Sequence, residues 1–239
     1  MRPEIVQIWV YLSASPLTWL TATLCAYWIG DAVSARFSRH ALANPVVIAA
    51  ALLSALLVAT GTGYRSFFDG AQFVHFLLGP ATVALAIPLY RNLATVRRAL
   101  LPMAAALVAG SVTAAVSAVG IAWLFGAPHE VLASLAPKSV TAPIAMELAK
   151  SLGGVPSLTA VLVVATGITG AVVVTPLMNA LKIRDYAARG FAAGVASHGI
   201  GTARAFQVSE LAGTFAGIAM GLNGALTSLL VLLWLAIAG

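Results

Sequence analysis

The chain has 239 residues, of which 61% are hydrophobic and only 8% are Asp, Glu, Lys or Arg. A water-soluble domain would need about a quarter of its residues charged, so the composition predicts an integral membrane protein. The formal net charge is +6, but the basic residues stand in short clusters between apolar runs, which is typical of membrane-protein loops and argues against a nucleic-acid partner. With a single cysteine, Cys25, the chain cannot hold an internal disulfide framework.

Five long apolar runs predict continuous helices, near 16–34, 44–61, 99–125, 155–178 and 212–237. No long polar linker separates them, so we expect one membrane domain over residues 1–239. The first ten residues carry Pro3 and Glu4 and lack a small-residue cleavage site, so we do not expect a removable signal peptide.

We expect three other segments, 66–90, 130–153 and 187–208, to be irregular, because each mixes polar groups with helix breakers. Basic clusters at 36–39, 91–98 and 182–189 belong on the cytoplasmic side, which requires that either 130–153 or 155–178 does not cross the membrane. Pro137 and Pro143 indicate that 130–153 is the segment that does not cross. We therefore expect an all-α membrane protein of about six to eight membrane segments. Two broken or re-entrant elements, 134–153 from outside and 190–206 from the cytoplasm, would meet near the bilayer centre.

The first broken element carries Lys138, Ser139, Thr141 and Glu147. Irregular backbone at membrane depth is tolerated only where it is buried in protein or lines water, and its free amides can hold an anion. The alternative is that Lys138 extends to the membrane surface and Glu147 pairs with Lys150 near a helix end.

The second broken element contains the string SHGIGTAR, with His198, Gly199, Gly201, Thr202 and Arg204. A guanidinium within a membrane segment is costly unless paired, and its planar fork matches a carboxylate. The alternatives are that Arg204 is interfacial, paired with Glu210 or lipid phosphate, and that His198 is a packing residue. GIGTAR lacks the strand and the lysine of nucleotide-binding loops.

Four stretches together resemble one family: LAPKSVTAPIAMELAKSLGGVPSLTAV, ITGA, ARGFAAGVASHGIGTARAF and AMGLNGALT. They are similar to the LrgB/CidB family, whose bacterial members are called antiholin-like proteins or murein-hydrolase regulators. The family is also similar to the LrgB-like part of plant plastidal glycolate/glycerate translocators. The resemblance implies a multi-pass protein of the bacterial inner (plasma) membrane that moves small carboxylates, often together with a small LrgA/CidA-type membrane protein. We also expect a homo-oligomer, a dimer.

The sequence thus predicts a secondary transporter of small carboxylates such as glycolate, glycerate, lactate or pyruvate, coupled to protons. Arg204 would clamp the carboxylate and Lys138 would add positive charge. Ser139, Thr141 and Thr202 would bond a substrate hydroxyl, and Gly199 and Gly201 would let the substrate approach the backbone. Either His198 or Glu147 would carry the coupled proton.

The rival hypothesis is an antiholin-like regulator of murein hydrolase activity and cell lysis that acts with an LrgA/CidA-type partner. We expect no enzymatic activity, cofactor or metal site, because no nucleophile–base pair and no metal-ligand spacing is visible.

Overall fold

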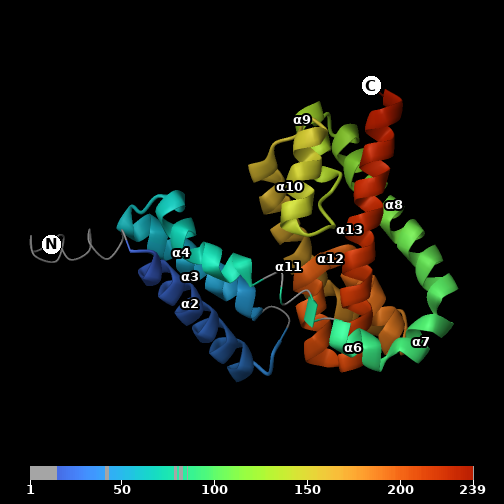
Figure 1. Cartoon of the computed structure of the whole chain (residues 1–239), viewed down its shortest axis with the longest axis horizontal. Coiled ribbons are helices and arrows are strands. Elements are labelled where there is room, and N and C mark those ends of the chain that lie inside the picture. The colour runs from blue at the N-terminus through green and yellow to red at the C-terminus, as the bar shows by residue number, and fades with distance from the viewer. Residues whose placement is uncertain (1–14, 41–42, 78–79, 81–82, 85, 239) are drawn as a thin grey trace, which may run out of the picture. The chain divides into compact units, whose positions relative to one another are not determined.

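The computed structural model describes residues 15–40, 43–77, 80, 83–84 and 86–238, and these residues form helices joined by short connections (Figure 1). The N-terminal segment considered for a signal peptide lies outside them. The chain divides into two compact units, 1–84 and 85–239, and each is described by itself. The expectation of a single domain stays a prediction.

The first unit contains α2 (Pro16–Arg36), α3 (Pro45–Thr60) and α4 (Tyr64–Phe76). Helix α3 begins at a proline after Asn44, whose side chain accepts a hydrogen bond from the Val46 amide at 2.9 Å, and it ends at Gly61, which has a φ of 64°. Helix α4 is continuous although we expected 66–90 to be irregular, because 64–76 contains no proline. Residues 78–79, 81–82 and 85 of that segment lie outside the described part.

The second unit contains α6 (Ala86–Arg91), α7 (Leu93–Arg98), α8 (Leu100–Leu124), α9 (His129–Leu135), α10 (Ala142–Ser151), α11 (Pro156–Ala180), α12 (Tyr186–Val208) and α13 (Glu210–Ala238). The five expected continuous helices are confirmed to within two residues at each end. Within the described residues, α8, α11 and α13 are long and apolar enough to cross a membrane, whereas the apolar α3 has only 16 residues. The expected six to eight membrane segments stay a prediction.

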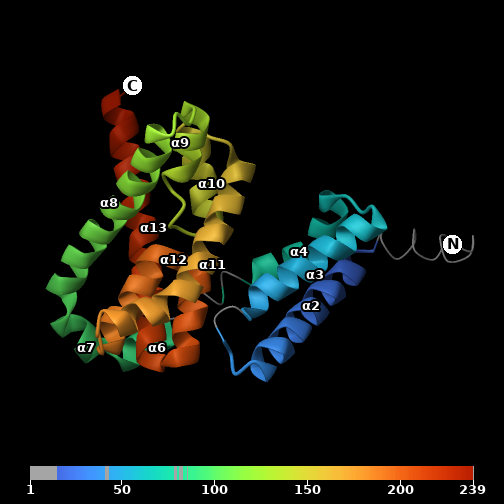
Figure 2. The ribbon, with the colours of Figure 1, turned by 180° about the vertical axis from the view of Figure 1, so that it is seen from behind.

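Contacts between the long helices fix their directions. The Ser111 hydroxyl of α8 bonds Asn223 of α13, and a Cβ on Gly110 would lie 3.0 Å from Val195 of α12. Glu210, the first residue of α13, pairs with Arg91 of α6 at 3.8 Å. Helices α8 and α13 therefore run from the end that holds α6 and α7 towards the end that holds α9, and α11 runs back (Figures 1 and 2). We call these the basic end and the α9 end.

Helix α12 is not straight, because it folds back on itself at His198. This residue has a φ of 42° and a ψ of −132°, outside the helical region. A Cβ on Gly201 would lie 2.7 Å from the Ala193 carbonyl oxygen, although eight residues of straight helix would separate them by about 12 Å. Tyr186 and Val208, the two ends of α12, line one pocket. We call this element the α12 hairpin; its two ends lie at the basic end.

Helices α9 and α10 form a second folded-back element, which we call the α9–α10 hairpin. Residues 136–141 between them are non-helical, and Pro143 stands in the first turn of α10, where a missing N–H costs little. At the other side of the element, His129 Nε2 lies 3.1 Å from the Leu152 carbonyl oxygen. The first and last residues of the α9–α10 hairpin therefore lie close together, at the α9 end. Both expected broken elements are present as folded-back helices.

Candidate functional site

The tips of the two hairpins meet on one side chain, Asn223 of α13. Its amide nitrogen donates to the carbonyl oxygens of Ser139 and Val195, each at 3.1 Å. Its amide oxygen accepts a hydrogen bond from the Ser111 hydroxyl of α8. Asn223 is 1% exposed. One buried amide therefore joins the α9–α10 hairpin, the α12 hairpin and α8.

The breaks in the hairpins create the need for Asn223. A straight helix would satisfy the Val195 carbonyl with the amide of residue 199, but the turn at His198 removes that partner. The Ser139 carbonyl lies in the non-helical stretch before α10. A carbonyl buried without a partner costs about 1–3 kcal/mol, so an asparagine at this depth stabilises both tips.

Glycines of α11 make room for the tip of the α12 hairpin. A Cβ on Gly167 would lie 2.7 Å from His198 Cε1, and a Cβ on Gly170 would overlap the Ser197 side chain. His198 Nε2 lies 2.9 Å from the Val163 carbonyl oxygen, which can only accept, so Nε2 carries the hydrogen. The Ser197 hydroxyl is buried and has no hydrogen-bond partner among the described residues.

The tips lie midway along the long helices. The residues that contact the tips lie near the middle of their helices: Ser111 in α8, Gly167 in α11 and Asn223 in α13. Val140, beside the Asn223-bound Ser139, packs against Val163 of α11. The two hairpins thus enter the unit from opposite ends and stop at a common level.

Lys138 brings a charge to this level. It is partly buried, and its ammonium group lies 3.3 Å from the Ser139 hydroxyl oxygen. The ion pairs in which both partners are described residues are Arg39–Asp31 and Arg91–Glu210, so no described carboxylate pairs with Lys138. Lys138, Ser139 and His198 are the expected site residues that the structure brings together.

Other expected site residues are engaged or lie farther away. The Thr202 hydroxyl donates to the His198 carbonyl oxygen at 2.8 Å, and Gly199 is exposed. Thr141 directly precedes α10 and its side chain makes no capping bond. Glu147 is exposed on α10 and forms no ion pair with another described residue.

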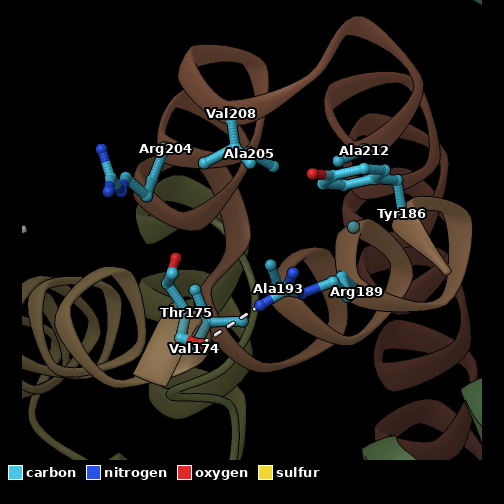
Figure 3. A pocket seen from close by; sticks show the side chains of 10 residues that line it. Val174, Thr175, Tyr186, Arg189, Ala193, Arg204, Ala205, Val208 and Ala212 are labelled. Atoms are coloured by element: carbon cyan, nitrogen blue, oxygen red, sulfur yellow. Dashed lines mark hydrogen bonds between the residues drawn. The ribbon is translucent and has the colours of Figure 1, made fainter. Parts of the chain in front are cut away.

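Arg204 lies in a pocket at the other end of the α12 hairpin. This pocket is also lined by Arg189, Tyr186 and Thr175 (Figure 3). Arg204 Nη1 donates to Gln207 at 3.2 Å, and Glu210, its suggested partner, pairs with Arg91 instead. The structure therefore separates Arg204 from Lys138 and His198, and groups it with Arg189.

Sequence reasoning missed Asn223, Ser111 and Arg189 as site residues. Asn223 stood in AMGLNGALT, a stretch noted only for its resemblance to a family. A polar amide in the middle of an apolar 29-residue helix is itself a signal, because such a group needs a partner in the membrane interior. Arg189 was read only as part of a cytoplasmic cluster.

Comparisons with known proteins identify the family to which the chain belongs. The model of the LrgB-like family matches residues 23–237. The chain belongs to the LrgB-like family. Protein YxaC of Bacillus subtilis is 35% identical over 184 residues, covering 77% of this chain and 80% of YxaC. Holin-like protein CidB of Staphylococcus epidermidis is 28% identical over 221 residues, covering 92% of this chain and 95% of CidB. No solved structure matches the chain significantly.

Proposed function

We propose that this LrgB-like chain is a secondary transporter of small carboxylates, which bind between the two hairpin tips. The observation that carries the proposal is Lys138, a partly buried ammonium without a carboxylate partner among the described residues, held where the tips meet. Burying a charge is costly unless it is paired, so the site favours an anion. The buried, unpartnered Ser197 hydroxyl offers a hydrogen bond to the hydroxyl of a 2-hydroxycarboxylate.

The arrangement of the hairpins suits alternating access. Broken helices that enter from opposite sides and meet at mid-depth are typical of secondary transporters. Asn223 joins both tips to α13, so an opening that parts the tips must release at least one of its bonds to Ser139 or Val195. We place the basic end in the cytoplasm of a bacterial cell, with the chain spanning the inner membrane.

Uptake by purified protein tests the proposal. Vesicles containing only this chain are given labelled glycolate, glycerate, lactate, pyruvate and acetate, and concentrative uptake of at least one is expected. Lys138→Gln removes the buried charge and should lower uptake at least about tenfold, which corresponds to about 1.4 kcal/mol of lost anion binding. Lys150→Gln, an exposed lysine on the same hairpin, is the matched control and should leave uptake unchanged. Equal effects of both variants, or no uptake of any acid, would contradict the proposal.

Proton coupling is assigned to His198. Its Nε2–H is held by the Val163 carbonyl, so an incoming proton would bind Nδ1. His198→Asn keeps a side chain that tolerates positive φ but cannot carry a proton at neutral pH. It should retain substrate exchange and lose uptake driven by a pH gradient. Retained pH-driven uptake would move the proton elsewhere, and Glu147→Gln then tests the second candidate.

The CidB relatives are named holin-like, which favours the rival hypothesis as a second function. In that hypothesis the chain regulates murein hydrolases and lysis with an LrgA/CidA-type partner. The two functions separate in cells that express the Lys138→Gln chain. If lysis depends on solute flux, this variant loses its effect on lysis together with uptake. A lysis effect that persists without uptake would assign the chain to the regulatory function, and a copurifying small membrane protein would identify the partner.

The expected homodimer is tested by the mass of the detergent-solubilised protein.

A further inference from the structure

A long groove follows the seam between α8 and the first arm of the α12 hairpin. One side is formed by a face of α8 between Ala99 and Ala114, and the other by a face of α12 between Asp185 and Ala196. Figures 1 and 2 show α8 diverging from α13 towards the end that holds α7. The free volume of the groove is about 460 Å³. A methylene group needs about as much room as a water molecule, ~30 Å³, so the groove can hold a chain of about 15 carbon atoms.

The surface of the groove is apolar. Its floor contains the buried rings of Phe191 and Phe215, and its exposed rims carry short side chains, such as Ala106 on α8 and Ala188 on α12. Asp185, at the basic end, is the one charged side chain among the described lining residues, and it caps the start of α12. The groove therefore suits a hydrocarbon chain and not a carboxylate substrate.

The length of the groove matches one leaflet of a bilayer. Between Ala99 and Ala114 the helix advances about 22 Å at 1.5 Å per residue. On α12 the lining reaches Ala196, just before the turn at His198, so the groove ends near the level of the hairpin tips. Half of a bilayer with its headgroups is about 20–22 Å thick. A transmembrane helix of a second copy would need a surface that continues through both leaflets, whereas one acyl chain needs only this half.

Basic side chains adjoin the mouth of the groove at the basic end. Arg98 directly precedes the first lining residue of α8, and Arg184 directly precedes Asp185, the first lining residue of α12. Both arginines are exposed, and neither forms an ion pair with another described residue. Segments 97–98 and 182–185 together carry four basic residues and one carboxylate. Clusters of this kind beside a membrane segment attract anionic lipid headgroups.

We propose that the groove between α8 and the α12 hairpin is a lipid site, which holds one acyl chain of an anionic phospholipid with its phosphate beside Arg98 and Arg184. The apolar groove selects the chain, and the basic mouth selects the headgroup charge. The bound chain would pack against Val195, whose carbonyl oxygen accepts from Asn223, and would thereby stabilise the first arm of the α12 hairpin. This site does not depend on the proposed transport activity.

Lipid binding to delipidated, detergent-purified protein tests the charge of the mouth. The protein is titrated with dioleoyl phosphatidylglycerol or dioleoyl phosphatidylcholine, which have the same acyl chains, and bound lipids are counted by native mass spectrometry. We expect phosphatidylglycerol to bind at least about tenfold more tightly. Arg98→Gln and Arg184→Gln should each weaken phosphatidylglycerol about fivefold, the effect of one cation near an anionic headgroup, and leave phosphatidylcholine unchanged. Lys150→Gln, which removes an exposed charge at the α9 end, is the matched control and should change neither lipid.

Filling the groove tests the acyl chain. Ala106→Leu and Ala188→Leu each place a larger side chain on one rim, and both should weaken the two lipids at least about tenfold. Ala105→Leu is the matched control, because Ala105 is equally exposed on α8 but does not line the groove. The proposal is overturned if the two lipids bind equally, or if the filled variants bind phosphatidylglycerol as tightly as Ala105→Leu. Filled variants that change a dimer into a monomer with lipid binding intact would also overturn it, in favour of a second copy.

Discussion

The two hairpins reach the same level of the second unit by different means. In the α9–α10 hairpin six non-helical residues, 136–141, lead to the start of α10; Pro137 lies among them, and Pro143 lies in the first turn of α10. In the α12 hairpin the helix reverses at the single residue His198, in a backbone conformation that costs about 1–3 kcal/mol outside glycine. A break of several non-helical residues leaves several polar groups without helical hydrogen bonds. A reversal at a single residue brings the two arms of the helix together and requires close packing around the turn. This is why the charge of Lys138 sits on the first tip and the glycine contacts surround the second.

Labelling of single cysteines gives an all-or-none test of how the two hairpins are oriented. Cys25→Ser provides the background, and cysteines replace Ala127, Ser151 and Arg184 one at a time. Position 127, before the α9–α10 hairpin, and position 151, at the end of α10, should both react with membrane-impermeant reagents from outside, and position 184 only from inside. Ser151 is preferred to the nearby Gly154, because a cysteine at Gly154 would place its Cβ 2.8 Å from the Ser134 amide nitrogen. Labelling of position 151 from the cytoplasm alone would mean that the first hairpin crosses the membrane.

Gly194→Ala should strongly disrupt the α12 hairpin. A Cβ there would overlap the carbonyl group of Ala216, as one on Gly190 would overlap that of Ala212, so the first arm packs directly on the α13 backbone. We expect stability to fall by about 3 kcal/mol or more, measured by thermal denaturation in detergent. Gly221→Ala in α13 is the control, because nothing lies within 4 Å of its Cβ position. It should be neutral or stabilising by about 0.4–1 kcal/mol. Equal melting temperatures would disprove the close packing.

Asn223→Leu should loosen both tips at once. It leaves the Ser139 and Val195 carbonyls and the Ser111 hydroxyl without their partner, at about 1–3 kcal/mol for each group. Hydrogen exchange should become faster in both 136–141 and 195–201. Ser228→Ala removes only a local bond to the Gly224 carbonyl and should change neither segment. Faster exchange at one tip alone would show that Asn223 does not join them.

The smallest effect concerns the hydroxyl groups. Ser139→Ala should weaken selection of glycolate over acetate by about 0.5–1.5 kcal/mol if its hydroxyl bonds the substrate. Thr202→Val should leave selectivity unchanged, because the Thr202 hydroxyl already donates to the His198 carbonyl. Competition uptake measures both values. A selectivity loss in Thr202→Val with none in Ser139→Ala would reverse their assigned roles.

Composition, apolar run length and helix-breaking residues by themselves determined the membrane class, the five long helices and the presence of two broken elements. These properties are local, because each depends on the residues of one segment and on the bilayer around it. The same local rules placed the polar residues Lys138 and His198 on the breaks. They could not show that these residues share one level of the unit.

Tertiary structure alone decided which polar groups act together. The reversal at His198 places Arg204 away from Lys138 and in the pocket that Arg189 also lines. The reason is that the second arm of the α12 hairpin runs antiparallel to the first, so residues farther from the turn lie closer to the start of α12. Asn223 looked like one polar residue in an apolar helix. Its role depends on the carbonyl groups of Ser139 and Val195, which lie 84 and 28 positions earlier in the chain and accept hydrogen bonds from its amide. Both carbonyls lie at breaks in other helical segments, where they have no helical hydrogen-bond donor. Hydrogen bonds between distant breaks depend on how helices pack, and no single segment specifies that.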